Sequence, residues 1–289
     1  MLTYIGIGLL YALYRLMPNA ALGRLGEWFG LLLYALVPAR RHIGSVNLRL
    51  CFPELAETER RRLLKAHYRA LGRASLMEAV AWWGSRAELE QLVRIEGLEH
   101  LERHLGQPLI LLAPHFVGLN LGGVRLTLLP IEFASMYRPV RNPMIDRMLR
   151  HARSRFGSSE LIARHEGIKP ALRAIRAGKP FYYLPDQDFG PRDALFVPFF
   201  GVPAATVTAL SRIARITGAR VLPCIVRQDG DGYVVELQPA WADFPGADVE
   251  SDTRRMNAFI EQQVRRMPEQ YFWLHRRFKT RPPGEPPVY

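Results

Sequence analysis

Apolar segments alternate with amphipathic segments over the second half of the chain. Short apolar runs predict strands at residues 109–113, 131–136, 181–184 and 221–226. Apolar residues at three- and four-residue spacing predict helices at 117–128, 143–156, 167–177, 206–217 and 252–267. The Asp-Gly-Asp-Gly sequence at 229–232 predicts a hairpin to a strand at 233–238. The pattern is typical of an α/β fold, and we expect a central mixed sheet flanked by helices.

Upstream of this region the chain is first strongly apolar and then amphipathic. Residues 1–17 contain one charged residue, Arg15, and a second apolar run covers residues 28–37. Both runs are short for a membrane crossing, which takes about 20 apolar residues. No basic stretch precedes the first run and no clear cleavage site follows it, so we predict an uncleaved N-terminal membrane-anchoring helix. The alternative is a pair of core helices in a soluble protein.

This interpretation divides the chain into membrane-associated helices at residues 1–40 and a second domain at residues 41–289. The basic residues just after the apolar runs place the body of the chain on the cytoplasmic side of a membrane. The second domain begins with a long predicted helix at residues 57–83, and the proline-rich tail from Pro282 is expected to be loose.

Composition and charge narrow the choice of partner. The chain has 289 residues, 48% of them hydrophobic and 23% charged, and its formal net charge is +12. It is therefore a folded protein with an anionic partner, which could be nucleic acid, an anionic lipid surface, or a phosphorylated or acidic substrate. The two cysteines, Cys51 and Cys224, have no metal or redox spacing, and this argues against a disulfide framework.

His115 is the main candidate for chemistry. It follows the apolar run at residues 108–113 and precedes the predicted helix at 117–128, so it lies in a strand-to-helix turn. From that turn it could meet Asn120, which would hold Nδ1–H and leave Nε2 free as a general base. A histidine that caps the helix or is buried in the core is an equal alternative from the local sequence.

Seven short segments, taken in order, resemble the lipid A biosynthesis acyltransferases, the lauroyl and myristoyl transferases within the wider lysophospholipid acyltransferase superfamily. The segments are NLRLCFPE at 47–54, APHFVGLN at 113–120, YRP at 137–139 with NP at 142–143, Arg153 and Arg155, PDQD at 185–188, FVPFFG at 196–201 and WLHRRFK at 273–279.

The resemblance implies a glycerolipid-acyltransferase-like fold and an acyl transfer from acyl carrier protein to a hydroxyl of a Kdo-bearing lipid A precursor. His115 would be the base that deprotonates this hydroxyl, because a hydroxyl is a poor nucleophile until a positioned base takes its proton. The reaction needs no metal and no other cofactor. The oxyanion of the tetrahedral intermediate could be held by free amides near Val117. The implied location is the cytoplasmic face of the bacterial inner membrane.

Position 120 departs from the family pattern, which is a histidine, four residues and then an aspartate or glutamate. Here the last position is Asn120. An amide can orient an imidazole but brings no charge to stabilise the imidazolium, and the comparable change in a serine-protease triad costs about 10⁴ in turnover. Three interpretations remain: a slow natural variant, an inactivating substitution, or an acid supplied from elsewhere, such as Asp186.

Further candidates surround this motif. Arg138 and Arg155 are predicted to bind headgroup phosphates, because guanidinium suits bidentate contact with phosphate. Asp186 and Gln187 follow an apolar strand and are predicted substrate-binding residues, with Asp186 orienting Arg155 or the substrate sugar. A metal site formed by Asp186, Asp188 and His115 is the less favoured alternative.

Three other functions remain open. One is a glycerophospholipid acyltransferase and another is a membrane scaffold without activity. Nucleic-acid binding would explain the charge, but it explains neither the apolar N-terminus nor the histidine motif, so no nucleic acid is expected. A basic C-terminal segment, Arg276, Arg277, Lys279 and Arg281, is predicted to face the acidic carrier protein or an anionic membrane.

Overall fold

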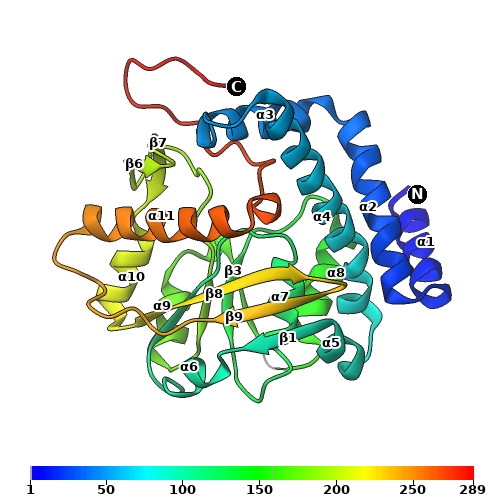
Figure 1. The fold of residues 1–289 in the computed structure, drawn as a ribbon. Coiled ribbons are helices and arrows are strands. Elements are labelled where there is room, and N and C mark those ends of the chain that lie inside the picture. Colours follow the sequence, from blue (N-terminus) through cyan, green and yellow to red (C-terminus); the bar gives the residue numbers. More distant parts are fainter. Residues whose placement is uncertain (1, 158) are drawn as a thin grey trace.

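A seven-stranded sheet forms the centre of the molecule (Figure 1). The computed structural model describes residues 2–157 and 159–289. Neighbouring strands of the sheet are parallel, except β8 and β9, which form an antiparallel hairpin. The mixed sheet is therefore confirmed. In spatial order its strands are β1 (Val93–Glu96), β9 (Gly232–Leu237), β8 (Arg220–Asp229), β2 (Leu109–Leu112), β5 (Phe181–Tyr183), β3 (Ala134–Tyr137) and β4 (Glu160–Ala163).

Helices cover both faces of this sheet, which explains why its central strands are apolar on both sides. Along β2, Ile110 and Leu112 belong to one buried cluster, whereas Leu109 and Leu111 belong to the other. The first cluster includes residues of α9 (Lys169–Arg176), α10 (Ala209–Thr217) and α11 (Val249–Arg266). The second includes residues of α4 (Glu57–Trp83), α7 (Leu119–Leu126) and α8 (Pro143–Ser154). All these helices were predicted, with boundaries that differ by up to three residues.

Several short elements were not predicted. They include α5 (Arg86–Leu92), α6 (Leu98–Glu102), the edge strands β1 and β4, and the hairpin of β6 (Ala194–Phe199) and β7 (Val202–Val207). The hairpin turns at Phe200 and Gly201, where φ is 53° and 73°. Residues 202–207 therefore form a strand, and the helix that was predicted from residue 206 begins at Ala209.

The N-terminal region forms three helices, α1 (Leu2–Leu16), α2 (Asn19–Leu36) and α3 (Pro38–Cys51). Met1, the first residue of the predicted anchor, lies outside the described residues. Within residues 2–157 and 159–289, no single helix has the length and apolar character needed to cross a membrane. Together α2 and α3 do, but they are bent by 94° at their break. The predicted membrane-anchoring helix thus has no support from any single helix.

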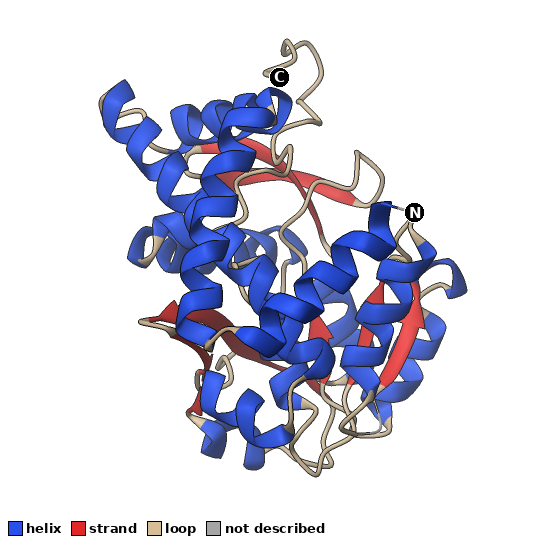
Figure 2. Cartoon of the chain, turned by 90° about the vertical axis from the view of Figure 1, so that its right-hand side faces the viewer, coloured by secondary structure: helices blue, strands red, loops and turns tan. Residues whose placement is uncertain are grey.

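Helix α2 packs closely on α4 through glycines. A Cβ atom at Gly30 would overlap the carbonyl oxygen of Tyr68, and one at Gly72 would overlap that of Gly26. The two backbones can approach because these side chains are absent. Figure 2 shows this side of the molecule, where long helices lie in front of the strands.

The C-terminal segment returns to the body of the protein. The Asn47 side chain donates hydrogen bonds of 2.7 Å to the carbonyl oxygens of Trp273 and His275, and it accepts one from the hydroxyl of Tyr289. The prediction of a loose tail from Pro282 is therefore wrong at its last residue. These contacts also show that two of the recognised segments, at 47–54 and 273–279, hold each other in place.

Candidate active site

The segment before α7 places His115 at the carboxyl edge of the sheet. Strand β2 ends at Leu112, and the chain turns through Gly118, where φ is 82°, before α7 begins. A Cβ atom at Gly118 would lie 2.6 Å from the Tyr233 ring, so only glycine fits this turn. The predicted strand-to-helix turn is confirmed.

Asp186 is the partner of His115. It follows β5, which is the parallel neighbour of β2, so both residues emerge at the same edge of the sheet. One carboxylate oxygen, Oδ1, lies 2.7 Å from Nδ1 of His115, and the other accepts a 2.9 Å hydrogen bond from the His115 backbone N–H. The Asp186 carboxylate therefore fixes both the ring and the backbone of His115.

The electrostatics of this pair favour one tautomer. Asp186 is 1% exposed, and this burial works to raise its pKa. The charge and hydrogen bonds of His115 outweigh burial, so the pKa of Asp186 is lowered and its carboxylate is ionised. Nδ1 then carries the proton that Asp186 accepts, and Nε2 is left as a base.

A large cavity adjoins the 22% exposed side chain of His115. Its volume is about 990 Å³, at the upper end of the range for small-molecule sites. Asn120, Arg138, Arg153 and Gln187 contribute polar groups to the lining. The apolar part of the lining includes Leu126, Phe133, Met136, Leu149, Leu172 and Ile213.

Asn120 does not hold the imidazole. Its Nδ2 donates a 2.6 Å hydrogen bond to Glu78 of α4, and its Oδ1 accepts one of 2.8 Å from Nε of Arg153. The predicted pairing of Asn120 with His115 is therefore wrong, because Asp186 occupies Nδ1. The contacts agree with the third interpretation of position 120, an acid supplied from elsewhere.

Sequence reasoning missed Glu78. Burial raises its pKa to about 7, although the hydrogen bond from Asn120 and the charge of Arg153 act in the opposite direction. Glu78 is the only charged residue between Arg73 and Arg86 in the sequence. A lone carboxylate in such an apolar stretch of helix was the signal that could have identified it.

Comparisons with known proteins assign the chain to a family. The model of the bacterial lipid A biosynthesis acyltransferases matches residues 1–280. The chain belongs to this family. It is 35% identical to the lipid A biosynthesis lauroyltransferase of Escherichia coli K12, over 100% of this chain and 94% of the relative. It is 34% identical to the myristoyltransferase of the same organism, over 91% of this chain and 81% of the relative.

A solved structure also resembles the fold. The 1-acyl-sn-glycerophosphate acyltransferase of Thermotoga maritima matches over 87% of this chain and 97% of its own, with a TM-score of 0.42 and 15% identity. At that level the likeness carries no argument for fold or function. The family assignment therefore rests on sequence.

Two residues that were predicted to bind substrate have other partners in the structure. Arg155 donates a 3.2 Å hydrogen bond to the carbonyl oxygen of Ala81 and another to that of Gly84, so it binds the C-terminal end of α4. It is absent from the described lining of the cavity. Asp186 binds His115 instead of orienting Arg155 or a sugar.

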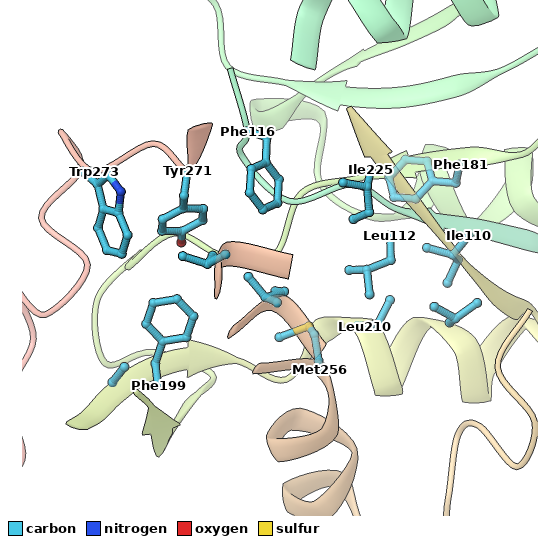
Figure 3. Packing of buried hydrophobic residues seen from close by; sticks show 14 of the residues in the cluster. Ile110, Leu112, Phe116, Phe181, Phe199, Leu210, Ile225, Met256, Tyr271 and Trp273 are labelled. Carbon is cyan, nitrogen blue, oxygen red and sulfur yellow. The ribbon is translucent and has the colours of Figure 1, made fainter. Parts of the chain in front are cut away.

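Two amides before α7, those of Phe116 and Val117, are also occupied. The N–H of Val117 donates a 2.8 Å hydrogen bond to the carbonyl oxygen of Gln270, and that of Phe116 donates to Pro114. The suggestion that a free amide near Val117 holds the oxyanion is therefore wrong for Val117 itself. Tyr271 packs on Phe116 behind this turn, at 5.6 Å between ring centroids (Figure 3).

Two further residues of the recognised segments have structural contacts. The Asp188 carboxylate accepts hydrogen bonds of 2.7 and 2.9 Å from the backbone and hydroxyl of Thr280. Among residues 2–157 and 159–289, no three His, Cys, Asp or Glu side chains are grouped so that they could hold a metal ion. Arg277 is buried, where it donates to Ala205 and Thr206 and so does not belong to an exposed basic segment. The predicted basic tail is wrong for this residue.

Proposed function

We propose that the protein transfers a fatty acyl chain from acyl carrier protein to a hydroxyl of a Kdo-bearing lipid A precursor. The observation that carries the proposal is the His115–Asp186 pair beside an apolar cavity of about 990 Å³. The family assignment supports the choice of lipid A precursor over other acceptors.

His115 acts as the general base in this proposal. Nε2 takes the proton of the acceptor hydroxyl while that oxygen attacks the thioester carbonyl carbon. The tetrahedral intermediate then collapses as the carbon–sulfur bond breaks, and the imidazolium returns its proton to the leaving thiolate. Asp186 holds the ring and stabilises the imidazolium, a role that requires its ionised form.

The lining of the cavity suggests how the lipids are held. The apolar side chains from α7, α8, α9 and β3 suit acyl chains. Arg138 and Arg153 offer guanidinium groups to anionic oxygens of the precursor, and Gln187 offers an amide to its polar headgroup. Arg164 and Arg192 add positive charge to the same lining.

The protein is further proposed to act at the cytoplasmic face of the inner membrane. Helices α1 and α2 expose large apolar side chains, including Leu16 at 82% and Trp28 at 70% exposure. Such a face, with arginines nearby, suits the interface of an anionic bilayer. Cosedimentation with vesicles that contain phosphatidylglycerol tests this, and Trp28→Glu is expected to reduce binding. Equal binding by that variant would contradict the proposal.

The activity is tested with purified protein, Kdo-lipid IVA and a set of acyl carrier protein thioesters of different length. A mass gain equal to one acyl chain is the expected result, and His115→Ala should abolish it. A mass gain that survives this substitution would overturn the role of His115. Lysophosphatidate serves as a second acceptor, and its preferential acylation would favour the glycerophospholipid alternative.

A further inference from the structure

Glu78, Asn120 and Arg153 form a polar chain that connects three helices beside the cavity. Glu78 lies on α4, Asn120 on α7 and Arg153 on α8. The hydrogen bonds are 2.6 Å from Asn120 to Glu78 and 2.8 Å from Arg153 to Asn120. Asn120 and Arg153 line the cavity, whereas Glu78 is not part of its described lining.

The chemistry of the three groups determines how Asn120 is oriented. A carboxylate accepts hydrogen bonds and a guanidinium donates them, so the amide must direct its NH₂ to Glu78 and its oxygen to Arg153. In the reverse orientation the amide oxygen would face the Glu78 carboxylate and the NH₂ would face the Arg153 guanidinium. Neither contact would then pair a donor with an acceptor. An aspartate at position 120 could accept from Arg153, but it would place a second carboxylate against Glu78, and the repulsion between the two groups would raise the pKa of one of them.

We propose that Glu78 is a positioning residue that supplies the carboxyl group which the family motif places at position 120, and that it holds Arg153 in the cavity wall through Asn120. The inference rests on the proposed acyl transfer, in which Arg153 meets an anionic oxygen of the reacting lipid. Asparagine at position 120 is then matched to glutamate at position 78. It does not mark a lost catalytic acid.

The proposal makes a specific claim about charge exchange. Asn120→Asp alone places two carboxyl groups in contact, and Glu78→Gln alone removes the carboxyl group that accepts from Asn120. The double variant Glu78→Gln with Asn120→Asp keeps one carboxylate and one amide in exchanged places. The exchange preserves a donor and acceptor at each contact, and the carboxylate then accepts directly from Arg153.

The experiment measures kcat and KM for acyl transfer in the wild type, both single variants and the double variant. Each single variant is expected to lose about tenfold or more in kcat/KM, and the double variant is expected to regain most of it, because residues in one network are coupled. Glu57→Gln is the matched control, since Glu57 lies on the same helix and pairs with the exposed Arg61. A double variant as impaired as the worse single variant would overturn the proposal, as would an unimpaired Glu78→Gln.

A second measurement separates this inference from the proposed function. Thermal unfolding of the same four proteins at pH 8 is expected to show a lower Tm for Asn120→Asp and recovery in the double variant. A wild-type protein without acyl-transfer activity would refute the proposed function. Recovery of Tm in the double variant would still support the pairing of Glu78 with Asn120. Additive losses of Tm would refute the pairing even in an active enzyme.

Discussion

At the scale of single residues, the Asp186 carboxylate determines what His115 can do. It is buried, ionised and bound to both Nδ1 and the backbone N–H of His115. An amide in its place would allow the ring to present a proton at Nε2, where the acceptor hydroxyl must be deprotonated.

Asp186→Asn is therefore expected to lower kcat by about 10³ to 10⁴, by analogy with the loss in a serine-protease triad. The measurement is the rate of acyl transfer at saturating donor and acceptor. Circular dichroism checks that the variant is folded. A folded variant with more than a tenth of the wild-type kcat would contradict the role given to Asp186.

Arg155 and Arg153 are two residues apart and are expected to respond differently. Arg155 binds the carbonyl groups at the end of α4, and its guanidinium carbon lies 4.2 Å from the centroid of the Phe156 ring. Arg155→Ala should lower Tm and leave the kcat of the folded enzyme near the wild-type value, whereas Arg153→Ala should lower kcat/KM. Equal losses of kcat/KM in the two variants would contradict this assignment.

The sequence was sufficient to find His115, but it gave Asp186 as its acidic partner only as one of three interpretations of position 120. A histidine between an apolar strand and a helix is a local feature, readable from residues 108–128. Its pairing with Asp186 spans 71 positions and depends on β2 and β5 being neighbours, which no local pattern specifies. Glu78 was missed for the same reason, because its contact with Asn120 joins α4 to α7 across 42 positions of the sequence.

At the scale of elements, the close crossing of α2 and α4 depends on glycine. A Cβ atom at Gly30 would overlap the Tyr68 backbone, which cannot move without shifting α4. Helix α4 also carries Glu78, so this crossing is connected to the site.

Gly30→Ala is expected to lower the free energy of unfolding by about 1–3 kcal/mol, the usual cost of overpacking, despite the better helix propensity of alanine. Gly8→Ala is the control, because nothing lies within 4 Å of a Cβ atom there and the position is also helical. Chemical unfolding measures both. A Gly30→Ala variant at least as stable as Gly8→Ala would show that the helices do not meet as described.

Long periodic elements were predictable, and the short ones were not. The helices α4, α8 and α11 carry a clear apolar pattern over 12 or more residues. The β6–β7 hairpin was not predicted because its turn places Phe200 at positive φ, where glycine or asparagine is expected. Edge strands β1 and β4 have four residues each, too few to show a period.

At the scale of the whole molecule, buried histidines are expected to limit stability in acid. Burial lowers the pKa of His67 to about 4, although a hydrogen bond with the carbonyl oxygen of Glu269 partly offsets it. Burial also lowers the pKa of His275 to about 4. Both rings are therefore neutral in the folded protein at pH 7. Each pKa rises on unfolding, so the unfolded chain binds more protons as the pH falls below about 6.5.

The resulting stability is fully present above about pH 6.5 and is lost as the pH falls towards 4. For His67 alone, the change in pKa corresponds to about 3 kcal/mol over this range. His67→Gln keeps a donor for the Glu269 carbonyl oxygen and removes the titrating group. It should reduce the slope of unfolding free energy against pH between 6.5 and 4 by about the contribution of one bound proton. Urea unfolding at a series of pH values measures the slope, with the exposed His165→Gln as the control. An unchanged slope in His67→Gln would mean that this ring is not held neutral by burial, and that the acid sensitivity of the protein arises elsewhere.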